Sequence, residues 1–209
     1  MRLMRMLTLM AALAAGVFAL ITFPTLAADE FSTFKSALSL RYAFDLKNSV
    51  HTFANEAFNT ESNDDKRQSR INLPLVFDFM KWIVGKTRWT HSEPPAVRLV
   101  SNTQLKTLYF GFGFEPEAIQ MHSLYSRETH IVYLRDTWNP DNLFDRSLLV
   151  HELVHHLQML NKLRMACPEE YEAQAYQLQI EWLREQGIQD PYKLLGLTEL
   201  AIDSLSQCP

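Results

Sequence analysis

Residues 148–158 read Leu-Leu-Val-His-Glu-Leu-Val-His-His-Leu-Gln, an apolar run that contains His-Glu-x-x-His. Apolar residues lie on nearly all sides of the run, which predicts a helix buried inside a domain. Because residues four apart lie on the same face of a helix, His151 and His155 direct their imidazoles to one point. This spacing supplies two ligands to a zinc ion, and Glu152 reaches a water there without being a ligand. The run therefore predicts two metal ligands and a general base.

A catalytic zinc site usually takes a third protein ligand. One known arrangement has Gly three residues and His or Asp six residues after the second histidine, where this chain has Gln158 and Asn161. That arrangement is therefore disfavoured, and a carboxylate on the next helix is the other option. Pro168 and the acidic residues after it are typical of a helix start, and Gly187 is a natural end for that helix.

Three glutamates near the start of this second helix compete for the third place. Glu169 and Glu170 fall in the first turn, where a solvated carboxylate complements the helix dipole. Glu172 is accompanied by Ala173 and Ala175, and small residues let two helices approach closely enough to share a metal. We predict Glu172 as the ligand, with Glu169 as the second choice.

The two segments together resemble the gluzincin metallopeptidases, which carry His-Glu-x-x-His and a downstream Glu-x-x-Ala. The likeness covers about the last hundred residues and is closest to small exported bacterial gluzincin-type families, many of them uncharacterised. It implies a zincin-like α+β fold, mostly helical, in which a small mixed sheet packs on the His-Glu-x-x-His helix and the Glu-bearing helix. It also implies a Zn²⁺ site formed by His151, His155 and Glu172, and hydrolysis of peptide bonds.

One feature of the larger gluzincins is missing, because no histidine follows His156 to stabilise the transition state. Tyr176 is the candidate for that role, with Tyr171 as an alternative. In gluzincin-like domains, a strand before the metal helix forms the sheet edge to which substrate adds as a further strand. The resemblance assigns that edge to residues 130–134, within a β-rich run.

Other elements are predicted from local patterns. An amphipathic helix is expected over 73–86, strands over 96–100 and 108–114, and one or two short helices over 191–205. Residues 28–70 are expected to form a helical extension that ends in the polar linker 59–70, conceivably a removable pro-segment. Residues 71–209 are expected to form the zincin-like metallopeptidase domain.

The N-terminus has the pattern of a secretory signal peptide. A basic start at 1–5 precedes an almost continuously apolar run at 6–22, and Thr25 and Ala27 are small residues suited to a cleavage site. We predict a signal peptide over 1–27 and a periplasmic or secreted protein, with cleavage after Ala28 or an uncleaved membrane anchor as alternatives.

Cleavage after Ala27 leaves 18 basic against 24 acidic residues, a net charge of −6, with no basic patch or stripe. Nucleic acid is therefore a poor candidate partner. The two cysteines, Cys167 and Cys208, both lie in the exported part, and an even pair in an oxidising compartment predicts a disulfide. Two free thiols are the alternative if export does not occur.

These features predict a zinc-dependent peptidase that acts on a peptide or protein substrate. Two other classes remain open: a zinc-binding but non-catalytic envelope protein, and an interaction module without metal whose histidines are satisfied by neighbouring groups. Glu152 argues against a purely structural metal site, because such a site needs no base at that position.

Overall fold

The computed structural model describes residues 17–22, 73–90, 93–111 and 120–208. The described part is an α+β fold, mostly helical, with one small mixed sheet. The predicted cleavage point, the extension at 28–70 and its polar linker fall outside these residues. The elements in chain order are β1 (Val17–Thr22), α5 (Leu73–Thr87), β2 (Ala96–Val100), α6 (Asn102–Phe110), β3 (Gln120–Ser126), β4 (Ile131–Arg135), α7 (Leu143–Leu160), α8 (Pro168–Glu185), α9 (Pro191–Leu195) and α10 (Glu199–Leu205).

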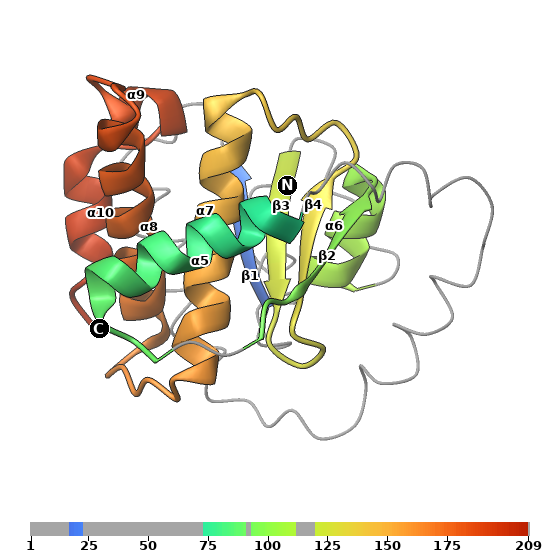
Figure 1. Ribbon diagram of the computed structural model, residues 1–209, viewed down its shortest axis with the longest axis horizontal. Helices are drawn as coiled ribbons and strands as arrows, with labels where there is room; N and C mark the ends of the chain where they lie inside the picture. Colours follow the sequence, from blue (N-terminus) through green and yellow to red (C-terminus); the bar gives the residue numbers. More distant parts are fainter. Residues whose placement is uncertain (1–16, 23–72, 91–92, 112–119, 209) are drawn as a thin grey trace, which may run out of the picture.

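Helix α7 contains His-Glu-x-x-His and lies at the centre of the fold (Figure 1). Its first turn is capped by Asn142, whose side chain accepts a hydrogen bond from the Asp145 N–H. Every residue from Ser147 to Gln158 is buried, because β3 and β4 pack against α7 on one side while α5 and α8 pack against it on others. The predicted buried helix is confirmed.

Helix α8 lies against α7 on the side away from the sheet (Figure 1). It begins at Pro168, and Gly187 follows its end in a left-handed conformation with φ of 88°. Ala175 is fully buried, so small residues do lie where the two helices need to approach closely. Cys167 and Cys208 form the predicted disulfide, which joins the residue before α8 to the segment after α10.

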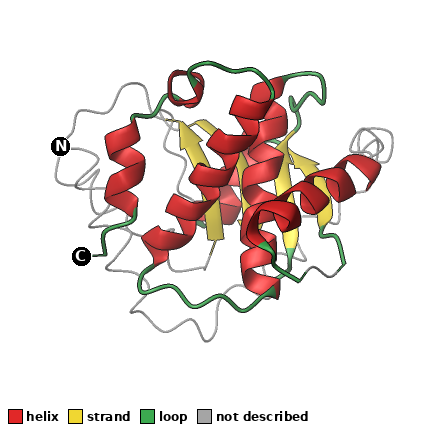
Figure 2. Ribbon diagram, turned by 60° about the vertical axis from the view of Figure 1, so that its left-hand side comes forward, coloured by secondary structure: helices red, strands yellow, loops and turns green. Residues whose placement is uncertain are grey.

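The sheet has the strand order β1-β3-β4-β2, and helices pack against it (Figure 2). Strands β2 and β4 are parallel, while β3 runs antiparallel to both of its neighbours. The strand predicted over the β-rich run is confirmed as β4, but β4 lies between β3 and β2. The edge role predicted for residues 130–134 is therefore wrong.

The strand predicted over 108–114 is also wrong in its described part, because residues up to Phe110 belong to α6. A capping box starts this helix: the Ser101 hydroxyl accepts from the Gln104 N–H, and the Gln104 side chain accepts from the Ser101 N–H. Gly111, with φ of 85°, ends it. Two local signals at the start and the end thus outweigh the strand-like composition between them.

The helix predictions over 73–86 and 191–205, which fall on described residues, are confirmed. Helix α5 buries Val76, Phe79, Met80 and Ile83, which is the spacing of one helix face, and packs against α7. Helices α9 and α10 are the two short helices expected near the C-terminus. Among the helices of the described segments, none is both long enough and apolar enough to cross a membrane.

Candidate metal centre

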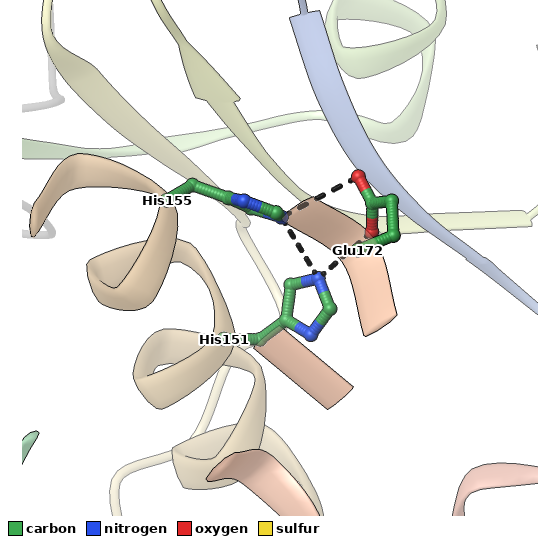
Figure 3. A group of neighbouring side chains, drawn as sticks. All are labelled: His151, His155 and Glu172. Atoms are coloured by element: carbon green, nitrogen blue, oxygen red, sulfur yellow. Dashed lines mark hydrogen bonds and ion pairs between the residues drawn. The ribbon is translucent and has the colours of Figure 1, made fainter. Parts of the chain in front are cut away.

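The structure brings His151, His155 and Glu172 together (Figure 3). The Nε2 atoms of the two histidines are 3.1 Å apart. The Glu172 carboxylate completes a triangle, with Oε2 3.3 Å from His151 Nε2 and Oε1 3.4 Å from His155 Nε2. The two histidines come from adjacent turns of α7, and the glutamate comes from the second turn of α8.

Hydrogen bonds on the far side of the His151 ring fix which nitrogen carries the hydrogen. His151 Nδ1 lies 3.0 Å from Gln179 Oε1. The Gln179 amide nitrogen donates to the Ser147 hydroxyl, which itself donates to the Phe144 carbonyl. The Gln179 oxygen therefore faces the ring as an acceptor, so His151 Nδ1 must donate and a neutral His151 has a bare lone pair on Nε2.

His155 is oriented in the same way by a different residue. Its Nδ1 lies 2.9 Å from Gln158 Oε1. The Gln158 amide nitrogen donates to the Tyr171 carbonyl and to Gln174 Oε1, which turns the Gln158 oxygen toward the ring. His155 Nδ1 is thus the donor, and Nε2 of the neutral ring is an acceptor.

Two imidazole lone pairs and a carboxylate consequently meet with no hydrogen between them. Burial lowers the pKa of His151 below its usual value, although Glu172 opposes that shift. Burial alone would raise the pKa of Glu172, but contact with His155 and His151 in their protonated forms outweighs it and brings this pKa to about 2, and a bound cation would keep the carboxylate ionised in the same way. Neutral imidazoles and an ionised carboxylate are the forms that bind a metal ion.

The triangle also has the dimensions that zinc requires. Ligand atoms held at 2.0–2.1 Å from a tetrahedral ion lie about 3.3–3.4 Å apart. The two Nε2 atoms, 3.1 Å apart, and the two Glu172 oxygens, one 3.3 Å from His151 Nε2 and the other 3.4 Å from His155 Nε2, are close to that spacing. The residues therefore fit a zinc ion in both donor chemistry and geometry, with three protein ligands.

Glu152 lies next to the triangle and is held by the sheet. Its Oε1 accepts a hydrogen bond of 2.6 Å from the Ser123 hydroxyl on β3, while its Oε2 has no partner among the described residues. Burial raises the pKa of Glu152 well above its usual value, and the bond from Ser123 opposes this rise. One carboxyl oxygen is thus positioned by the protein, and the other is left for a further donor.

Tyr176 also lies beside the triangle, as a residue one turn after Glu172 on α8. Its ring centroid is 4.6 Å from that of His151. Burial raises the pKa of Tyr176 well above its usual value, and the carboxylates of Glu172 and Glu152 raise it further. The hydroxyl therefore keeps its hydrogen and can act as a donor.

The two remaining glutamates of the first turn of α8 differ from each other. Glu169 is fully buried, and neither of its carboxyl oxygens has a hydrogen-bond partner among the described residues, so its predicted solvated position is wrong. It does not belong to the cluster of ligand atoms, which contains Glu172. Glu170 accepts from the Ala166 N–H, as a first-turn carboxylate should.

The site is enclosed. His151, Glu152 and His155 are each at most 1% exposed, and Glu172 is 8% exposed. Two surface cavities of about 280 and 300 Å³ lie along the side of α8 that carries Gln177 and Glu181, and none of the four site residues lines them. In this arrangement the site residues have almost no contact with solvent.

Four residues that support the site were missed by the sequence reasoning: Ser123, Ser147, Gln158 and Gln179. For Gln179 a signal did exist, because it follows Glu172 by seven residues and so shares its helix face. Gln158 was recognisable as a polar residue inside a buried run. Ser123 carried no signal, because its role depends on how β3 lies over α7.

Comparison with known proteins gives one match. No curated protein and no solved structure matches the chain. A family model described as "Domain of unknown function (DUF6647)" matches residues 68–201, which include every residue of the metal centre. Since this match covers well over half of the chain, the protein belongs to the DUF6647 family.

Proposed function

We propose that the protein is a zinc-dependent peptidase with a zincin-like fold, in which His151, His155 and Glu172 hold the ion. The observation that carries this proposal is the meeting of two lone pairs and a carboxylate at 3.1–3.4 Å in a buried site, next to a glutamate that is not a ligand. Three protein ligands favour a catalytic over a structural role, because structural zinc sites are closed by four.

A zinc ion bound there would supply a Lewis acid that activates water and polarises the scissile carbonyl. The charge of a bound ion would oppose the burial that raises the pKa of Glu152 and would keep this carboxyl ionised. Glu152 would then take a proton from the attacking water on Oε2 while Ser123 holds Oε1 in place. The same carboxyl then passes the proton to the leaving amine. Tyr176, protonated and beside His151, donates a hydrogen bond to the oxyanion of the substrate.

The proposal includes export, because the basic start, the apolar run at 6–22 and the small residues Thr25 and Ala27 form a signal-peptide pattern. The disulfide between Cys167 and Cys208 is consistent with it, since such bonds persist mainly in oxidising compartments. Sequencing the N-terminus of protein recovered from the periplasm of a bacterial host tests export directly. An N-terminus at Ala28 or Asp29 is expected.

The decisive experiment combines metal analysis with hydrolysis assays. The full chain and the protein recovered after export are each analysed for bound zinc, then assayed on casein and a peptide library with and without chelator. Glu152→Gln should keep zinc and lose at least about 100-fold in hydrolysis, because it removes the general base. His151→Ala should lose zinc, while His156→Gln is a control on the adjacent buried histidine that should retain it.

The outcomes separate the three classes of protein. Zinc without hydrolysis in either preparation would indicate the non-catalytic metal protein. Absence of zinc would indicate an interaction module, and a fully active Glu152→Gln variant would discard Glu152 as the base. Far-UV circular dichroism of each variant shows whether a loss of zinc is local or reflects unfolding.

A further inference from the structure

We infer that Glu169 binds a positively charged group of the substrate beside the metal centre, either its free α-amine or the side chain of a Lys or Arg. The inference rests on the proposed function, and it adds the chemical class of the substrate. The observation that carries it is that Glu169 is fully buried while neither of its carboxyl oxygens has a hydrogen-bond partner among the described residues.

Glu169 lies on the face of α8 that meets the metal centre. Residues three and seven apart share a helix face, so Glu169, Glu172 and Tyr176 form one row. Glu172 reaches both ligand histidines, and the Tyr176 ring lies against the His151 ring. Glu169 continues this row beyond Glu172, and the Cβ atoms of the two glutamates are about 5–6 Å apart at this spacing. Because Glu169 is enclosed together with the ligands, a movement that admits a substrate to the ion would also expose Glu169.

The packing of α7 and α8 shows at which end of the site Glu169 lies. His151 lies 3.0 Å from Gln179. Gln158, two turns later on α7, bonds to Tyr171, which is two turns earlier on α8, so the helices are antiparallel. Glu169 is therefore at the end of the site toward the C-terminus of α7. Three residues span about 4.5 Å of a helix and an extended peptide advances about 3.4 Å per residue, so a group held by Glu169 would belong to a residue about one or two positions from the scissile bond.

Nothing in the described part of the chain compensates the Glu169 carboxylate. It has no hydrogen-bonded cation there, and the nearby Ala166 N–H is bonded to Glu170 instead. A buried charge without a partner lowers stability strongly. Natural proteins keep such unfavourable groups mainly at functional sites, where the partner arrives with a ligand.

The missing partner is an organic cation rather than a second metal ion. A metal ion needs several ligand atoms close together, and among the described residues Glu169 belongs to no group of three or more potential ligands. An ammonium or guanidinium group brings its own N–H donors and pairs with a single carboxylate. The charges agree with this choice, because the two positive charges of a zinc ion would balance Glu172 and Glu152 and leave the charge of Glu169 uncompensated.

A set of matched peptides tests the inference. The peptides are short alanine peptides with acetylated and amidated ends, and one residue, at each position in turn, is Lys, Arg or norleucine. Norleucine gives a side chain of similar length to that of Lys without its charge. Each norleucine peptide is also made with a free α-amine, so the two sources of positive charge are compared separately.

The wild type should hydrolyse a Lys, Arg or free-amine peptide with a kcat/KM at least about tenfold above that of its neutral counterpart. Glu169→Gln keeps the shape of the side chain, so it should lose this preference and keep hydrolysis of the neutral peptides within about twofold. Glu170→Gln removes a carboxylate from the same turn and is the matched control that should retain the preference. A preference for the free amine assigns the α-amine, and one for Lys or Arg at a given position assigns the side chain.

Two further readouts do not depend on hydrolysis. Calorimetry measures the binding of the same peptides to Glu152→Gln protein with zinc in the buffer, with and without Glu169→Gln, and the affinities should show the same preference of at least about tenfold. Thermal unfolding of the zinc-free protein should occur at an equal or higher temperature in Glu169→Gln than in the wild type, because an unpaired buried charge is removed. A midpoint lowered by more than about 5 °C would show that Glu169 is paired within the protein, and would overturn the inference.

The binding assay separates this inference from the proposed function. If no protein hydrolyses peptides but the preference that depends on Glu169 appears in binding, the cation subsite stands and the proposed function fails. If hydrolysis occurs without such a preference, the inference alone fails. Absence of both hydrolysis and peptide binding overturns both.

Discussion

At the level of single residues, the chemistry of the site depends on two glutamines that would not be expected to touch a metal. Gln179 and Gln158 each have their amide orientation set by a second partner, so each accepts a hydrogen bond from a histidine Nδ1. This leaves both Nε2 atoms as acceptors that face one point. Two neutral side chains thereby give the pair of histidines the acceptor atoms that a cation would need.

Replacing Gln179 with Ala should therefore weaken zinc binding without removing a ligand. The variant loses the acceptor that holds the hydrogen on His151 Nδ1, so the ring is free to adopt the wrong tautomer and orientation. A 10–100-fold loss of zinc affinity is expected, measured by competition with a coloured chelator. Gln177→Ala, on an exposed position of the same helix, should leave the affinity unchanged. Equal affinities for both variants would contradict the assigned role.

His122 gives a pH dependence whose sign follows from its surroundings. Burial, helped by the positive charge of Arg135, lowers the pKa of His122 to about 4, below the usual 6.5. The unfolded chain then binds a proton more readily than the folded protein, so stability is complete above pH 6.5 and declines as the pH falls toward 4.

The measurement compares thermal unfolding of the zinc-free wild type and His122→Gln at pH 7.5 and 4.5. His151 and His156 have lowered pKa values as well, so some decline remains in the variant. The decline should nevertheless be smaller in His122→Gln than in the wild type. An identical decline in both would show that His122 is not protected from protonation by its position against Phe144.

At the level of elements, the long helices and strands β2 and β4 were predictable, whereas β3 was not. Helices α5, α7 and α8 have many apolar positions at helical spacing, so a few polar residues do not hide their pattern. Strand β3 reads Gln-Met-His-Ser-Leu-Tyr-Ser, and its two serines are buried, with Ser123 donating to Glu152 and Ser126 accepting from the Thr129 N–H. A strand that depends on tertiary contacts has little local signal.

The same reasoning explains the site predictions at this level. Glu172 was predictable from two local patterns. One is the His-Glu-x-x-His run of α7, and the other is the small residues beside Glu172, which let α8 approach α7 closely. The edge position predicted for residues 130–134 was wrong because strand order depends on which strands pair, and pairing is not visible in the composition of one segment. Strand β4 is β-rich because it is interior, with Val132, Tyr133 and Leu134 all buried.

At the level of the whole molecule, the metal centre joins parts of the chain that are far apart. Helix α7 contributes two ligands, α8 contributes one, and β3 holds the neighbouring glutamate, so the site depends on the packing of the sheet against both helices. The disulfide between Cys167 and Cys208 fixes the start of α8 and closes a loop of 41 residues.

Removing this disulfide, with both cysteines changed to alanine, should cost about 3–4 kcal/mol of stability in the chain-entropy model. The free energy of unfolding is measured in urea for the zinc-free wild type and the variant. The variant should also bind zinc more weakly, because the helix that carries Glu172 is less firmly held. A loss below about 1 kcal/mol with unchanged zinc affinity would show that packing alone holds α8 in position.

The position of this disulfide has a consequence for the timing of maturation. While the ribosome is still adding the 41 residues after Cys167, the last of which is Cys208, the disulfide cannot form. Helix α8, which carries Glu172, is then held by packing alone. If the site binds zinc as proposed, binding would be tighter once synthesis has passed Cys208 and an oxidant has formed the bond. Oxidation of the two cysteines would therefore assist the binding of the ion during maturation.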